Sequence, residues 1–234
     1  MNVHQLSKRL ANVAEYLPKG SLFADIGSDH AYLPCYVCLN DPSAQAIAGE
    51  VNQGPYTSAW KEVKDHGLEG RIDVRLGNGL QVLKSNEVCQ IVIAGMGGPL
   101  IRDILENGKE KLSETERIIA QPNIDARSVR KWFFQNGYDL TDEIILEENG
   151  HIYEILVGDK GKPDASYDSL NMEKQFWLGP HLLKKGGRVF DAKCKAELEK
   201  KEYVLSQVKQ ASVVNEEKVV QLQVEINWLK EALK

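Results

Sequence analysis

Short apolar segments alternate with helical patterns from residue 22 to residue 157, and this alternation restricts the possible folds more than any other feature of the sequence. The first five of seven strand-like segments are apolar without alternation, which is typical of strands buried on both faces. The last two have no long helical pattern between them. The sequence therefore predicts an α/β fold: a parallel sheet with helices on both faces and an added antiparallel hairpin at its edge. The predicted strands are 22–27, 44–51, 72–76, 89–95, 117–121, 141–146 and 152–157, and the predicted helices between them are 31–39, 56–66, 100–105 and 126–136.

The C-terminal part of the chain has a different pattern, without strand-like segments from residue 191 onward. Apolar residues recur there in alternating three- and four-residue steps, as in a coiled coil. Polar residues, including Ser212 and Asn215, interrupt this stripe near 211–216. We therefore expect an antiparallel helical hairpin, with one unbroken dimerising helix as the alternative. The predicted division is a Rossmann-like domain at 1–160 and a helical coiled-coil domain at 161–234.

Other bulk features exclude some classes of protein. The chain has no run of eighteen apolar residues, so no membrane-spanning helix is expected. Residues 1–17 form an amphipathic helical pattern without the apolar region of a signal peptide, and we expect a cytoplasmic protein. Cys35 and Cys38 form a CxxC, but no second pair follows, so core cysteines are expected rather than a metal site.

The loop after the first predicted strand, residues 25–31 (DIGSDHA), is the first candidate site. It does not fit the G-x-G-x-x-G of dinucleotide-binding proteins. It fits the acidic-x-Gly loop with which methyltransferases bind S-adenosylmethionine. Asp25 and Asp29 can accept hydrogen bonds from the ammonium of that cofactor, and backbone N–H groups around Gly27 and Ser28 can bind its carboxylate. The alternative is a buried Asp25 satisfied by the backbone and a helix-capping Asp29.

Three later strand ends supply further candidates for cofactor binding. Glu50 ends the second predicted strand, where an acid can accept both ribose hydroxyls. Asn78, in the turn after the third strand, can face the adenine amino group. The glycine-rich run 93–98 allows close approach of the backbone to a ligand. The predicted contacts outside the first loop are Glu50, Val51, Asn78, Gly79, Ala94, Gly95 and Met96.

Residues 25–34 (DIGSDHAYLP), 93–98 (IAGMGG) and 121–123 (QPN) together resemble the bacterial tRNA (adenine(22)-N1)-methyltransferase family, the TrmK type. The likeness extends over nearly the whole chain. It implies S-adenosylmethionine as methyl donor and N1 of adenine 22 in the tRNA D-arm as acceptor. Asn78 departs from the family, in which an acidic residue is usual. A small-molecule methyltransferase and a non-catalytic cofactor-binding protein of the same fold remain alternatives.

Methyl transfer to N1 requires little acid–base chemistry, because neutral adenine already has a lone pair on this atom. Positioning then supplies most of the catalysis. The product carries a positive charge, so we expect Asp29 to stabilise it. Tyr32, Asn123 and Tyr153 are expected to hold the base, whereas His30 is expected to cap or pack.

Basic residues are distributed unevenly, and this determines where RNA is expected to bind. The net charge is −5, but residues 181–234 carry 11 basic and 8 acidic residues. Local basic surface attracts phosphate even on an acidic protein. We expect tRNA as partner and a monomer or weak dimer, without metal or membrane. The candidate clusters, each of which could instead be a solvated face, are Lys184, Lys185, Arg188, Lys193, Lys195, Lys200 and Lys201; Arg127, Arg130 and Lys131; and Lys8 and Arg9.

Overall fold

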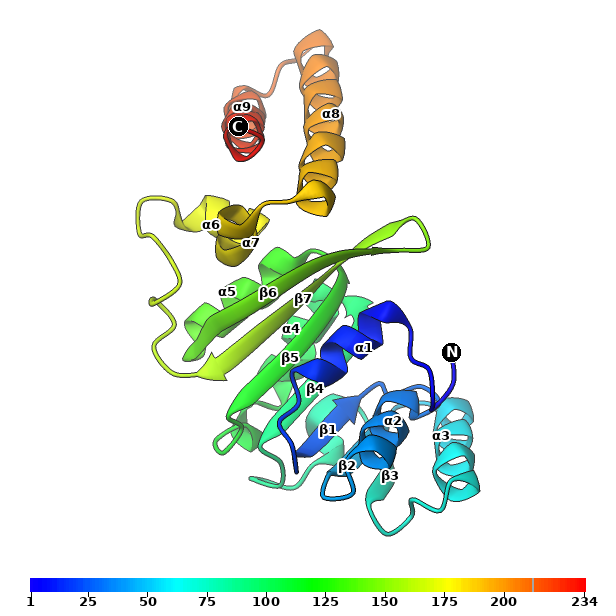
Figure 1. Cartoon of the computed structure of the whole chain (residues 1–234). Coiled ribbons are helices and arrows are strands. Elements are labelled where there is room, and N and C mark those ends of the chain that lie inside the picture. The colour runs from blue at the N-terminus through cyan, green and yellow to red at the C-terminus, as the bar shows by residue number, and fades with distance from the viewer. Residues whose placement is uncertain (212) are drawn as a thin grey trace.

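The computed structural model describes residues 1–211 and 213–234, and a seven-stranded sheet lies at its centre (Figure 1). The strand order is β3-β2-β1-β4-β5-β7-β6. Neighbouring strands from β3 to β5 are parallel, whereas β7 is antiparallel to both β5 and β6. The predicted α/β class and its edge hairpin are therefore confirmed. The strands are β1 (Leu22–Ile26), β2 (Gln45–Glu50), β3 (Ile72–Leu76), β4 (Gln90–Gly97), β5 (Arg117–Ile124), β6 (Tyr138–Glu148) and β7 (His151–Lys160).

Helices cover both faces of this sheet because its strands are apolar on both faces. Successive side chains of a strand point to opposite sides. In β1, Phe23 packs in the cluster with α2 (Tyr32–Asn40) and α3 (Gln53–Asp65), whereas Ala24 packs in the cluster with α4 (Gly98–Asn107) and α5 (Ala126–Gln135). Short 3-10 helices, η1 (Gly79–Val82) and η2 (Lys109–Lys111), complete the connections.

The N-terminal helix is shorter than the predicted 1–17. Helix α1 comprises Lys8–Glu15 and is capped by Ser7, whose hydroxyl accepts a hydrogen bond from the backbone N–H of Leu10 (3.3 Å). The preceding residues instead form a turn, in which the side-chain oxygen of Asn2 accepts from the backbone N–H groups of residues 4 and 5 (2.9 Å each). Side chains that bind the backbone in this way favour turns over helix.

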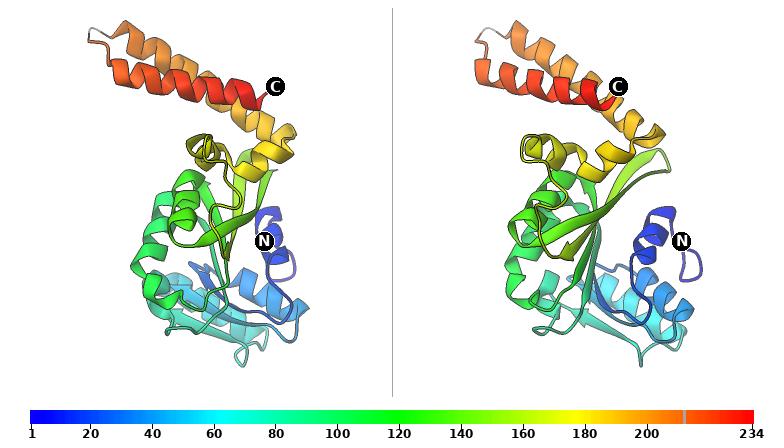
Figure 2. Two further views of the ribbon diagram at one scale, coloured as in Figure 1. Left: turned by 90° about the vertical axis from the view of Figure 1, so that its left-hand side faces the viewer. Right: turned by 60° about the vertical axis from the view of Figure 1, so that its left-hand side comes forward.

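After β7, every regular element that the structure describes is a helix. Helices α8 (Arg188–Gln210) and α9 (Glu216–Ala232) form the predicted antiparallel hairpin, which projects beyond the sheet (Figure 2). Asn215 caps α9 by accepting from the N–H of Lys218 (3.0 Å), which explains the polar break in the apolar stripe. The alternative of one unbroken helix is wrong. Ser212 lies outside the described residues, and the division at residue 160 stays a prediction.

Two short helices, α6 (Met172–Leu178) and α7 (Pro180–Lys185), were not predicted, and they join the hairpin to the sheet. A buried ion network holds this junction. The guanidinium of Arg130 on α5 is fully buried and donates to Glu143 on β6 (Nε–Oε1, 2.6 Å) and to Glu154 on β7. Arg130 also donates to two backbone carbonyls at the end of α6 (3.2 Å each), and Lys193 of α8 pairs with Glu154.

Candidate functional site

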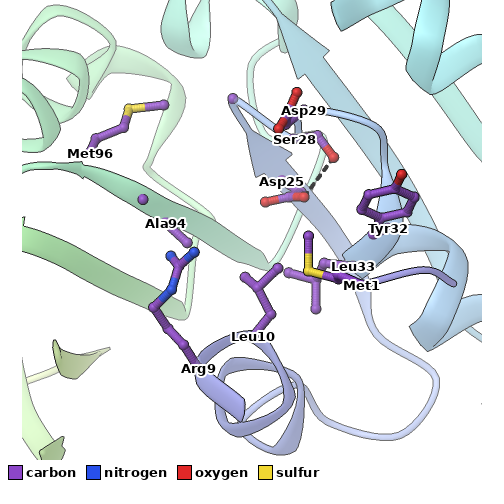
Figure 3. A pocket seen from close by; sticks show the side chains of 12 residues that line it. Met1, Arg9, Leu10, Asp25, Ser28, Asp29, Tyr32, Leu33, Ala94 and Met96 are labelled. Atoms are coloured by element: carbon purple, nitrogen blue, oxygen red, sulfur yellow. Dashed lines mark hydrogen bonds between the residues drawn. The ribbon is translucent and has the colours of Figure 1, made fainter. Parts of the chain in front are cut away.

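A cleft of about 250 Å³ opens at the C-terminal ends of β1 and β4 (Figure 3). The chain leaves β1 toward α2 on one face of the sheet and leaves β4 toward α4 on the other. Open α/β sheets bind ligands at the point where the connections from two neighbouring strands leave toward opposite faces. Eight predicted site residues line the cleft: Asp25, Gly27, Ser28, Asp29, Tyr32, Ala94, Gly95 and Met96.

Asp25 is a buried carboxyl group at the wall of this cleft. Its exposed fraction is 4%, and its Oδ2 accepts a hydrogen bond from the hydroxyl of Ser28 (2.6 Å). Burial raises the pKa of Asp25 to about 7; the Ser28 hydrogen bond opposes this shift, and the nearby Glu50 adds to it. A cationic ligand group in the cleft would favour the ionised form of Asp25.

The loop after β1 is held by hydrogen bonds to β2. The N–H groups of Gly27 and Ser28 donate to the carbonyl of Gly49 (2.9 and 3.3 Å), and the N–H of Asp29 donates to the carboxylate of Glu50. Asp29 itself has a φ of 49°, in the left-handed region. Three backbone amides that could have bound a ligand carboxylate therefore already have acceptors. Binding of the cofactor carboxylate by amides around Gly27 and Ser28 stays a prediction, which these three groups do not support.

Glu50 lies behind the loop and is 5% exposed. Burial raises its pKa, and the hydrogen bond from the Asp29 N–H opposes that shift. Val51, which follows it, is 59% exposed, and Asn78 and Gly79 lie at the start of η1, beyond β3. These four residues do not line the cleft, but they lie at or just after the ends of β2 and β3, along the same edge of the sheet.

On the β4 side, a chain of hydrogen bonds connects the cleft to the end of β5. The N–H of Gly95 donates to the side-chain oxygen of Gln121 (3.0 Å), and the side-chain amide of Asn123 donates to the carbonyl of Gly95 (2.8 Å). The Gln121 amide also donates to the oxygen of Asn123 (3.3 Å). Gln121 is fully buried and was not predicted as a site residue, although its tripeptide, 121–123, is one of the three motifs that carry the family resemblance.

Asn123 also lines a second groove, of about 560 Å³, between the sheet domain and α8. Its lining includes His151 of β7 and Lys200 of α8. The cleft and the groove thus lie on either side of the hydrogen bond between Gly95 and Asn123.

The aromatic candidates lie on different walls. Tyr32 lines the cleft, and its ring stacks on that of His30 (5.1 Å between centroids). Tyr153 lies on β7, and the guanidinium carbon of Arg9 is 5.2 Å from its ring centroid. Packing is the predicted role of His30, and this stacking is consistent with it.

Arg9 points into the cleft, although its predicted role was in an RNA-binding surface cluster. Its Nη1 donates to Gln121 Oε1, and the guanidinium lies beside Gly95. Residues four apart lie on one face of a helix. Because Val13 is the buried residue of α1, a basic residue four positions earlier could have indicated an inward-facing cation.

Most of the other predicted RNA-contacting side chains have acidic partners. Arg130 is buried in the ion network, so its prediction as an RNA contact is wrong. Among the residues described, three exposed cations near the base of the hairpin have no ion pair: Lys184, Arg188 and Lys195. The paired cations are Arg127 and Lys131 with Glu173, Lys185 with Asp142, Lys193 with Glu154, Lys200 with Glu197, and Lys201 with Glu225.

Burial raises the pKa of the Cys35 and Cys38 thiols to about 12 and about 11, which makes both inert at neutral pH. Within residues 1–211 and 213–234, no group of three or more His, Cys, Asp or Glu could hold a metal ion. No helix in that part of the chain is long and apolar enough to cross a membrane.

Comparison with known proteins gives one consistent family. The family described as tRNA (adenine(22)-N(1))-methyltransferase matches residues 23–231. The tRNA (adenine(22)-N(1))-methyltransferase of Bacillus subtilis (strain 168) is 47% identical over 235 residues, covering 100% of this chain and 99% of the relative. The crystal structure of the B. subtilis M1A22 tRNA methyltransferase TrmK has a TM-score of 0.95 at 46% identity, over 99% of this chain and 100% of that one. A putative tRNA (m1A22) methyltransferase of Streptococcus pneumoniae, in complex with S-adenosyl-L-methionine, has a TM-score of 0.86 at 41% identity, over 98% and 100%.

Proposed function

The chain belongs to the tRNA (adenine(22)-N(1))-methyltransferase family, and from this membership we propose that it transfers a methyl group from S-adenosylmethionine to N1 of adenine 22 in tRNA, with the cofactor bound in the cleft between β1 and β4. The observation that carries the assignment of the cleft is the convergence of the Asp25 loop and the Gly95 turn at one point of the sheet edge. Two groups of residues that lie far apart in the sequence meet there, and the proposed cofactor site needs contacts from both.

Each group of predicted residues along this edge of the sheet has a separate part in the proposal. Asp25 binds the ammonium of the cofactor, and Glu50, with one oxygen on the Asp29 N–H, offers the other to the ribose. Val51, Asn78 and Gly79 face the adenine end, farther along the same edge. When bound, S-adenosylmethionine supplies an electrophilic methyl group, and the protein contributes position and charge.

The acceptor adenine approaches from the side of Asn123 and Tyr153. Asn123 connects the cleft with the larger groove below the hairpin, so an extruded base can reach Gly95 from this direction. N1 lies on the Watson–Crick edge, and the base must be unpaired before it can react. Asp29 stabilises the positive charge of the product, and Tyr32 supports the base.

The same proposal extends to the tRNA body. The exposed cations Lys184, Arg188 and Lys195 near the base of the hairpin attract its phosphates, which orient the RNA without taking part in the chemistry. A cytoplasmic location, the absence of a metal, and a monomer or weak dimer stay predictions.

The test is to incubate the full-length protein with unmodified tRNA and isotopically labelled S-adenosylmethionine, and to map modified nucleosides by mass spectrometry. We expect N1-methyladenosine at position 22 and no product on the same tRNA with guanosine at that position. Methylation at another position, of small metabolites only, or of nothing would contradict the proposal.

A further inference from the structure

Arg9 lines the cofactor cleft and has an unused hydrogen-bonding group. Its Nη1 donates to Gln121, and its guanidinium lies over the ring of Tyr153. Its Nε is buried and has no hydrogen-bond partner within the described part of the chain. A buried N–H without an acceptor costs free energy, and such groups in native proteins usually have a ligand or water to bind.

The charges of the cleft are arranged in two groups. Asp25 and Asp29 stand on the β1 side, and Arg9 stands on the side of α1 and β4 (Figure 3). Leu10 and Leu33 provide apolar surface in the same cleft. An α-amino acid group, which carries an ammonium and a carboxylate on one carbon and methylene groups beyond it, matches this arrangement.

Four backbone N–H groups at the cleft already have acceptors. The N–H groups of Gly27 and Ser28 donate to Gly49, and that of Asp29 donates to Glu50. The N–H of Gly95 donates to Gln121 (3.0 Å). The guanidinium of Arg9 is a cationic side-chain donor that this cleft still has available.

We propose that Arg9 binds the carboxylate of the cofactor's amino-acid tail through Nε and the free edge of its guanidinium. The planar guanidinium matches the two oxygens of a carboxylate and can donate two parallel hydrogen bonds. This inference rests on the proposed function, since it assigns one end of the same ligand. It also gives α1 a function: the helix closes the cleft over the tail of the cofactor.

The experiment compares two ligands on the full-length protein by isothermal titration calorimetry. One is S-adenosylhomocysteine, and the other is its decarboxylated analogue, which retains the ammonium. The wild-type protein should bind the first about 10- to 100-fold more tightly, the range for charge-assisted hydrogen bonds. The Arg9→Gln variant should bind both ligands with nearly equal affinity, whereas Lys8→Gln, which removes a neighbouring exposed charge on the same helix, should keep the wild-type ratio.

The ratio of affinities separates carboxylate binding from a merely structural role. If Arg9 only holds α1 against Gln121 and Tyr153, its replacement would weaken the binding of both ligands equally. An unchanged ratio of affinities in Arg9→Gln would therefore overturn the inference. If Arg9→Gln does not fold, Arg9→Lys must lower the ratio, because an ammonium cannot form the two-pronged contact. Failure of the wild-type protein to bind either ligand would instead overturn the proposed function, and this inference with it.

Discussion

At the scale of single residues, the acidic groups of the cleft are the most unusual feature of the protein. Asp25 is buried at the end of a parallel strand, where a carboxylate is costly unless it is paired. Its one side-chain partner in the described structure is the Ser28 hydroxyl, at 2.6 Å. Asp25 is thus prepared for a ligand that brings its own positive charge.

Cofactor affinity should depend on pH through Asp25, whose pKa is raised to about 7 in the free protein. Binding of an ammonium requires the ionised form, so affinity for S-adenosylhomocysteine should fall as pH decreases below 7, approaching about tenfold per pH unit. For the free protein the sign is opposite. A raised pKa stabilises the folded state below the ordinary pKa of an aspartate, and this contribution is lost as pH rises through about 7.

Calorimetry between pH 5.5 and pH 7.5 measures this dependence, at about half-unit steps chosen to span the midpoint of such a titration. The Asp25→Asn variant should bind weakly and with much less dependence on pH. A wild-type affinity that stays constant over this range would contradict the role of Asp25.

At the scale of elements, Arg130 determines how the C-terminal helices are attached to the sheet. It lies on α5 and reaches β6, β7 and the end of α6 at once. Gly179, which separates α6 from α7, has a φ of +90°, and a Cβ there would lie 2.7 Å from a carboxylate oxygen of Glu143 and 2.8 Å from the guanidinium of Arg130. The ion network and the glycine together fix the angle at which the helices leave the sheet.

Replacing Arg130 with methionine should destabilise the protein by about 3–5 kcal/mol, because it leaves the buried Glu143 without a cation. The matched control is Arg127→Met on the same helix, whose pair with the exposed Glu173 is expected to contribute about 0–1 kcal/mol. Urea denaturation followed by circular dichroism measures both changes in the free energy of unfolding. Equal destabilisation of the two variants would show that the buried network does not hold the junction.

At the scale of the whole molecule, the proposed function makes the cleft, the groove and the hairpin a continuous path for RNA. The groove contains residues from both β5 and α8, so its shape depends on how the hairpin is attached. Several lysines of the predicted basic cluster are neutralised by acids of the protein. The exposed side chains of Lys184, Arg188 and Lys195 retain unpaired charge in the described structure.

Reversing the charge of Lys184 and Arg188 to glutamate should weaken tRNA binding and flatten its salt dependence, by about one unit of logarithmic slope for each phosphate that is no longer bound. The control is the same reversal at Lys61 and Lys64 on α3, which lies at the far end of the molecule from the hairpin (Figure 1). Filter binding at two or more salt concentrations measures both slopes, and S-adenosylhomocysteine affinity should be unaffected. If both double variants bind tRNA equally well, the base of the hairpin is not a docking surface.

The sequence by itself determined the strands, the helices of the C-terminal hairpin and the edge of the sheet at which the cleft forms. The apolar strands, the loop from Asp25, the acid at Glu50 and the polar break at Asn215 are local patterns, because strand burial, tight turns and helix caps depend on neighbouring residues. The glycine-rich run 93–98 is also a local pattern. These features fixed the α/β class, the cofactor edge and the helical hairpin.

Only the tertiary structure decided the roles of Arg9 and Arg130. In the sequence both are basic residues within amphipathic helices, and the local pattern does not specify the partners of either side chain. Arg9 meets a glutamine 112 positions away, and Arg130 meets carboxylates 13 and 24 positions away on two further strands. Such contacts arise only when the sheet brings distant segments together, because the free energy of a buried charge depends on partners that local sequence does not specify.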